Sequence, residues 1–129
     1  MTPNSATAEG VELAAAAVLR NTAVAAHALA DLAVRDDRYD QLAALAAASY
    51  ATEATIYLPL PDSVPGDLGR AADHDLVGRL TALADALDSL ARTSDDVQQL
   101  RDRHTAALHT RDAATALRNA LPVDQGPVG

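Results

Sequence analysis

Cysteine, phenylalanine, tryptophan and lysine are all absent from this chain of 129 residues. Without cysteine there can be no disulfide framework and no thiolate chemistry, which is typical of a protein from a reducing cytoplasm. The aromatic residues are limited to Tyr39, Tyr50 and Tyr57. Because strands favour β-branched and aromatic residues, this scarcity argues against a β-sheet core.

Signals for export or membrane insertion are weak. The first ten residues lack the basic and apolar regions of a signal peptide. Residues 41–60 carry a single charge, Glu53, but serine, threonine and tyrosine interrupt their alanines, so the stretch is too weakly apolar for a membrane span. We therefore expect a soluble cytoplasmic protein with no membrane partner.

Basic charge is in the minority, with ten arginines against 18 acidic residues and a net charge of −8. An acidic surface repels phosphate backbones, so DNA is not an expected partner. The preference for alanine, arginine and aspartate is typical of a high-GC bacterium.

Alanine and leucine, with 31 and 18 residues, dominate the composition. They are the strongest apolar helix formers. Alanine lets helix axes approach closely but buries little area, so leucines must supply most of the apolar stabilisation. The composition therefore predicts an all-α protein with a thin core, which favours completion of that core by a second copy of the chain.

Apolar periodicity predicts four helices, over residues 8–34, 37–57, 73–91 and 95–120. The expected N-caps are Asp36 or Asp37, Asp73 or Asp75, and Ser94. The connecting loop over residues 58–72 holds three prolines and two glycines and divides the chain into two helical hairpins. These elements predict a single domain over residues 1–129, an antiparallel up-down-up-down four-helix bundle with flexible ends at residues 1–7 and 122–129.

Two helices carry unusual polar residues. In the second, the three tyrosines are 11 and 7 residues apart and share one stripe, on which Glu53 lies between Tyr50 and Tyr57. This group predicts a buried acid, a ligand anchor or the centre of a protein interface, or else a half-exposed, solvent-facing edge.

The third helix has a heptad seam of leucines, and the fourth helix breaks such a seam with cations. The leucines of the third helix are Leu76, Leu80, Leu83, Leu87 and Leu90. Continuing the seam of the fourth helix from Val97 and Leu100 places His104, Arg111 and Arg118 where leucine is expected. Either these side chains find buried partners, forming a polar or anion-binding site in the core, or the helix rotates and they lie at the core margin.

Known site motifs are missing from the sequence. A di-metal site in a helical bundle needs Glu-x-x-His pairs, and none of the three glutamates precedes a histidine by three residues. No glycine-rich phosphate loop and no nucleophile elbow occurs. We therefore expect no metal and no cofactor.

One short motif points to an enzyme. Arg103, followed by His104 and then His109, resembles the Arg-x(4–6)-His signature of HEPN domains, which are helical bundles, often dimeric, many of which cleave RNA. The resemblance implies a ribonuclease in which Arg103 and His109 act on a phosphodiester at a dimer interface. The acidic composition argues against an RNA substrate.

Charge is distributed unevenly between the two hairpins. Only Arg20 is charged between Leu13 and Ala30, whereas the third and fourth helices carry charges every few residues. Charge-poor surfaces of this kind mark interfaces. The expected function is thus a non-enzymatic protein–protein interaction module, a homodimer with Tyr50, Glu53, Tyr57, His104 and Arg111 as interface or binding residues. The alternative is a helical-bundle enzyme or anion-binding protein with a polar core site, including the HEPN-like ribonuclease.

Overall fold

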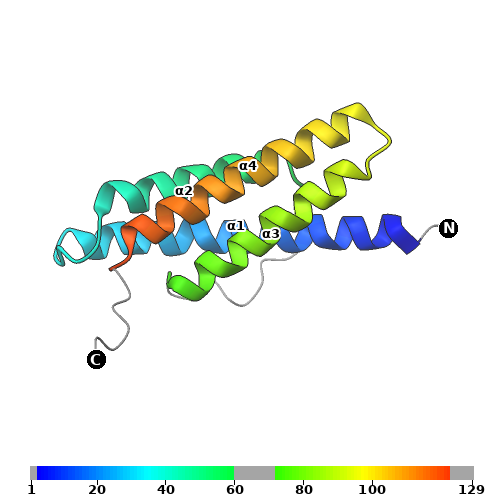
Figure 1. Ribbon diagram of the computed structural model, residues 1–129. Helices are drawn as coiled ribbons and strands as arrows, with labels where there is room; N and C mark the ends of the chain where they lie inside the picture. The colour runs from blue at the N-terminus through cyan, green and yellow to red at the C-terminus, as the bar shows by residue number, and fades with distance from the viewer. Residues whose placement is uncertain (1–2, 60–71, 123–129) are drawn as a thin grey trace, which may run out of the picture.

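The computed structural model describes residues 3–59 and 72–122. Within these ranges the chain forms four α-helices and no strand (Figure 1). The helices are α1 (Pro3–Ala33), α2 (Gln41–Ile56), α3 (His74–Arg92) and α4 (Val97–Ala120). The prediction of an all-α four-helix bundle is confirmed. The expected C-terminal flexible end beyond Pro122 and most of the expected connecting loop, residues 60–71, lie outside the described residues.

The start of α1 differs from the prediction. The helix begins at Pro3, whereas residues 1–7 were expected to be flexible. Proline is tolerated in the first turn of a helix because the N–H that it lacks would have no partner within the helix there.

The N-caps of α2 and α4 also differ from those expected. Asp40 caps α2, and its Oδ1 accepts a hydrogen bond from Ala43 N at 3.1 Å. Asp36 instead pairs with Arg38 in the preceding turn. Asp96 caps α4 in place of Ser94. In each case several oxygen-bearing side chains precede the helix, and sequence alone does not decide between them.

The cap of α3 is one of the two expected. Asp73 caps the helix and accepts a hydrogen bond from Leu76 N at 2.9 Å.

Helix directions follow from contacts at one end of the bundle. Asp40 N donates to the carbonyl oxygen of Ala120 at 3.0 Å, so α2 begins beside the end of α4. His74 Nε2 lies 3.0 Å from the carbonyl oxygen of Pro122, so α3 begins there too. Helices α2 and α3 therefore run in the same direction, opposite to α4, as Figure 1 shows.

This direction of α3 differs from the alternating up-down-up-down order that was expected. The end of α2 and the start of α3 consequently lie at opposite ends of the bundle. The connection between Pro59 and Ala72 must run along the bundle for about the length of α3, whose 19 residues extend about 28 Å. Its twelve intervening residues can reach roughly 40 Å, so the connection is long enough.

The core is built mainly from alanine. Leu19, Leu80, Leu87 and Leu117 are its largest apolar side chains with essentially no exposure. The α2 face in the core consists only of alanines, namely Ala44, Ala47, Ala48, Ala51 and Ala54. Small side chains let α2 pack closely on both α1 and α4, the two helices that it contacts most.

Among the described residues, one helix is long and apolar enough to cross a membrane by length and composition alone. It comprises Ala8–Ala33 of α1, and 44% of its most apolar window is buried inside the bundle. The face that includes Ala15, Leu19 and Ala26 belongs to the core. This packing is that of a core helix in a bundle.

Candidate functional site

The two tyrosines near the end of α2 stack on a histidine of α4. The ring centroids of Tyr57 and His109 are 6.0 Å apart with an interplanar angle of 17°, and those of Tyr50 and His109 are 6.4 Å apart at 23°. His109 Nδ1 is buried and has no hydrogen-bond partner within the described chain. The cluster joins α2 to α4 mainly by ring contact.

Glu53 does not join this cluster as a buried acid. Its side chain is exposed, although it lies on the same stripe of α2 as Tyr50 and Tyr57. The interpretation of Glu53 as a buried acid is therefore wrong, and the stripe is a half-exposed edge of α2. Sequence reasoning missed His109 as the third member because the register between α2 and α4 cannot be obtained from either helix alone.

His104 and Arg111 lie on the outer side of the α3–α4 pair. Arg111 donates to Asp85 Oδ1 at 2.8 Å and forms an ion pair with Asp88, while His104 Nδ1 lies 3.2 Å from Asp88 Oδ1. His104 itself is exposed. These side chains form a surface ion-pair network and not a polar site in the core.

The electrostatics of Asp88 follow from its partners. Partial burial opposes ionisation of this carboxyl group, but hydrogen bonds and charge from Arg111 and His104 outweigh it, so the pKa of Asp88 lies below its ordinary value. The hydrogen bonds that Arg111 donates to Asp85 and Asp88 raise the pKa of Arg111. The network stabilises the charged forms on both helices.

Of the two interpretations of the fourth helix, the rotation that leaves the cations at the core margin matches the structure. Val97, Leu100, His104 and Arg118 are exposed, and the helix instead turns Arg103, Ala106 and Thr110 inward. Thr110 Oγ1 donates to the carbonyl oxygen of Ala106, so its hydroxyl is satisfied inside the core. Alanines and the hydrogen-bonded Thr110 pack more closely than the cationic side chains of the predicted seam could. In this orientation, Arg103 is the only charged side chain of α4 that becomes buried.

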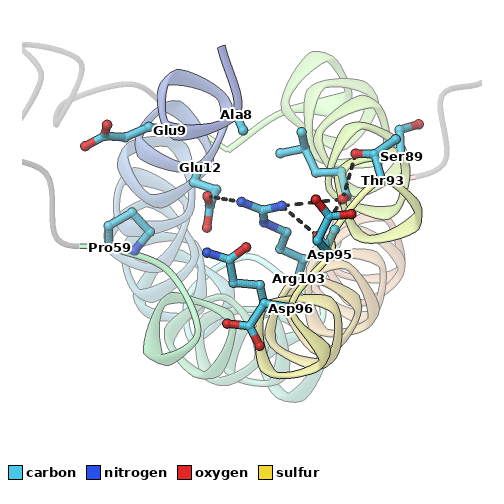
Figure 2. A pocket seen from close by; sticks show the side chains of 12 residues that line it. Ala8, Glu9, Glu12, Pro59, Ser89, Thr93, Asp95, Asp96 and Arg103 are labelled. Atoms are coloured by element: carbon cyan, nitrogen blue, oxygen red, sulfur yellow. Dashed lines mark hydrogen bonds and ion pairs between the residues drawn. The ribbon is translucent and has the colours of Figure 1, made fainter. Parts of the chain in front are cut away.

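Arg103 is the one buried cation of the described residues, with 9% of its surface exposed. Its Nη2 donates to Glu12 Oε1 of α1 at 2.9 Å, and its Nη1 donates to Ser94 Oγ at 2.7 Å. Figure 2 shows the guanidinium between these partners at the end of the bundle. A carboxylate and a hydroxyl already hold the charge, so Arg103 is not a free anion receptor.

A cleft of about 900 Å³ surrounds this ion pair. The exposed charged side chains that line it, Glu9, Asp95 and Asp96, are all acidic. The acidic rim disfavours a phosphate ligand.

Arg103 and His109, the residues of the HEPN-like motif, have separate surroundings. Arg103 contacts α1 and α3, whereas His109 contacts the tyrosines of α2. Six residues along a helix turn the side chain by about 240°, which accounts for the two faces. Within one chain, the two side chains therefore have different partners.

Metal-binding clusters are also absent from the described residues, where no group of three histidine, aspartate or glutamate side chains could hold an ion.

The largest departure from a simple bundle is an apolar stripe on the outer side of α2. Leu42 is 79% exposed, Ile56 67% and Leu45 41%. Together with Ser49 and Thr52, which are also exposed, they are spaced three, four, three and four residues apart. We call these five residues the α2 seam. Their heptad spacing is visible in the sequence, but alanines surround it, and sequence alone does not show that the alanines face inward.

Comparison of the chain with protein-family models, with curated proteins and with solved structures gave no match. The surfaces described above therefore carry the functional argument.

Proposed function

We propose that this protein is a non-enzymatic protein–protein interaction module that forms a homodimer through the α2 seam. The observation that carries the proposal is the seam itself, an exposed stripe with three large apolar side chains and no charge. Leucine and isoleucine side chains gain about 1.5–3 kcal/mol each when they move from water to an apolar contact. A stripe at heptad spacing fits another helix.

The position of the seam supports its availability for contact. Helix α2 packs on α1 and α4, and in Figure 1 no helix covers its outer side. The hydroxyl of Thr52 donates to the carbonyl oxygen of Ala48 at 2.9 Å, so its hydrogen-bonding is satisfied within the helix. The seam can therefore enter an apolar contact without leaving this polar group unpaired.

The charge distribution supports a second copy as the occupant. Each chain carries a net charge of −8, so two copies repel one another overall. The seam itself holds no charge, so contact through it places no like charges of the seam opposite one another. Tyr50, Glu53 and Tyr57 lie beside the seam and belong to the margin of the contact, whereas His104 and Arg111 lie on the α3–α4 side.

Composition suggests the setting. We place the protein in the cytoplasm of a high-GC bacterium on the basis of its alanine, arginine and aspartate content and its lack of cysteine.

Light scattering on purified variants tests the contact surface. Leu42→Asp and Ile56→Asp each put a carboxylate into the seam on both copies, and we expect each to weaken the dimer more than tenfold, because an unpaired charge would be desolvated. The matched control is Val97→Asp, since Val97 is 65% exposed on α4, away from the seam. Equal loss of dimer in all three variants, or in none of them, would contradict the proposal.

A further inference from the structure

We infer that the two copies pair with their α2 helices antiparallel, across a two-fold axis that passes beside Ser49. The inference rests on the proposed function and adds the orientation and register of the contact. A two-fold interface must be self-complementary, because residue i contacts residue j and j contacts i. An antiparallel pair of α2 seams centred on Ser49 meets this requirement.

The side-chain sizes along the seam are matched about its centre. Ser49 is the middle residue, and Leu42 and Ile56 lie seven residues before and after it. When two seams run in opposite directions across Ser49, Leu42 lies opposite Ile56 of the second copy. Large apolar side chains then meet at both ends, and the two small serines meet at the centre, where the helix axes can approach closely.

The intermediate positions are complementary in the same register. Leu45, four residues before Ser49, lies within one residue of the level of Thr52 of the second copy, three residues after it, so a large side chain packs beside a small one on each side of the axis. In a parallel pair, Leu45 would face Leu45 of the second copy, and Thr52 would face Thr52 of the second copy. Alternation of large and small residues across a helix interface gives closer packing than matched large pairs.

Charge also favours the antiparallel orientation. Glu53 is the only charged residue of α2 and lies beside the seam, four residues beyond Ser49. In a parallel pair the two Glu53 carboxylates would face one another. In the antiparallel pair they are separated by about 12 Å along the helix axis, which is a Debye length or more in physiological salt.

Single-cysteine variants test this register against a background that has no cysteine. We expect Ser49→Cys to form a disulfide-linked dimer under mild oxidation, because the two Cα atoms beside the axis come within the 4.4–6.8 Å that a disulfide needs. Leu42→Cys alone should not cross-link, since its two copies lie about 21 Å apart along the axis. A mixture of Leu42→Cys and Ile56→Cys should give the mixed dimer. Ser89→Cys, on an exposed serine of α3, is the matched control.

The outcomes separate the inference from the proposed function. Cross-linking of Leu42→Cys alone as fast as Ser49→Cys would establish a parallel pair and overturn the inference. If the wild-type chain is a dimer that Leu42→Asp disrupts but Ser49→Cys links no faster than Ser89→Cys, the seam remains the contact surface and only the register is wrong. A monomeric wild-type chain would overturn both.

Discussion

Among the described residues, Arg103 is the buried cation, and its burial carries a desolvation penalty. It is buried near the end of the bundle, and its charge is held by Glu12 of α1 and by the hydroxyl of Ser94. Removing one partner of a buried ion pair leaves the other charge without compensation, whereas replacing both by apolar residues is often neutral. The pair therefore fixes the relative position of α1 and α4 at this end of the bundle.

Substitution of Glu12 tests that role. We expect Glu12→Gln to reduce the free energy of unfolding by about 2 kcal/mol in urea denaturation, because the guanidinium stays buried without its carboxylate. Glu9→Gln removes an exposed glutamate one turn earlier, and its effect should stay within about 0.5 kcal/mol. Similar small effects for both variants would show that Arg103 does not depend on Glu12.

The ion-pair network of Asp88 predicts a pH dependence. The pKa of Asp88 is held below its ordinary value of 3.8 in the folded protein, so its carboxylate contributes stability above that pH. This contribution is lost as the pH falls through the folded pKa. The stability difference between wild type and Asp88→Asn should therefore be largest near neutral pH and shrink as the pH falls below 3.8.

Urea denaturation at a series of pH values measures this difference. Asp95→Asn, at an exposed aspartate outside the network, is the control. A wild-type advantage over Asp88→Asn that persists or grows in acid would contradict the assigned role of the Arg111 and His104 contacts.

At the scale of single helices, α3 is the element that sequence predicts best. Leu76, Leu80 and Leu87 are buried as the heptad pattern indicates, and Leu83 packs against the core. Leucine is the only large apolar side chain repeated on this helix at regular spacing, so a single amphipathic face is possible. Both the type of element and its inward face therefore follow from the amino-acid pattern of this segment alone.

Helices α2 and α4 show why the candidate site could not be derived in the same way. In α2 almost every residue is apolar or small, so hydropathy does not distinguish its faces, and the alanine face packs inward while Leu42 and Ile56 remain exposed. In α4 a single buried cation, Arg103, finds a partner on α1. Tertiary partners decide both orientations, and a single sequence does not reveal them.

The alanine face of α2 predicts a sharp response to added volume. We expect Ala51→Leu to lower the free energy of unfolding by about 1–3 kcal/mol, because α2 would have to move away from its neighbours. Ala82→Leu, at an exposed position of α3, is the control and should be close to neutral. Thermal denaturation of both variants measures the contrast, and an unchanged midpoint for Ala51→Leu would show that α2 is not closely packed.

At the scale of the whole molecule, the distribution of side chains distinguishes two sides. Helices α3 and α4 carry the ion-pair network and charged residues of both signs, whereas the outer side of α2 carries the uncharged seam. A thin alanine core gives each chain limited buried apolar area. Covering the seam with a second copy would add leucine and isoleucine contacts that the single chain lacks.

The four-helix class of the molecule could be predicted from its composition, but the order of helix directions could not. Short connections force neighbouring helices to run in opposite directions, as in α3 and α4. The connection between Pro59 and Ala72 is long enough to permit either direction, and the contacts of Asp40 and His74 with the end of α4 decide for a parallel α2 and α3.

Sedimentation equilibrium of the wild-type chain over a wide range of concentration measures whether the α2-seam dimer forms. We expect a reversible species of twice the 13.3 kDa chain mass, which Leu42→Asp converts to single chains and Val97→Asp leaves unchanged. A mass of 13.3 kDa at every concentration, or a dimer that Leu42→Asp does not disturb, would contradict this expectation.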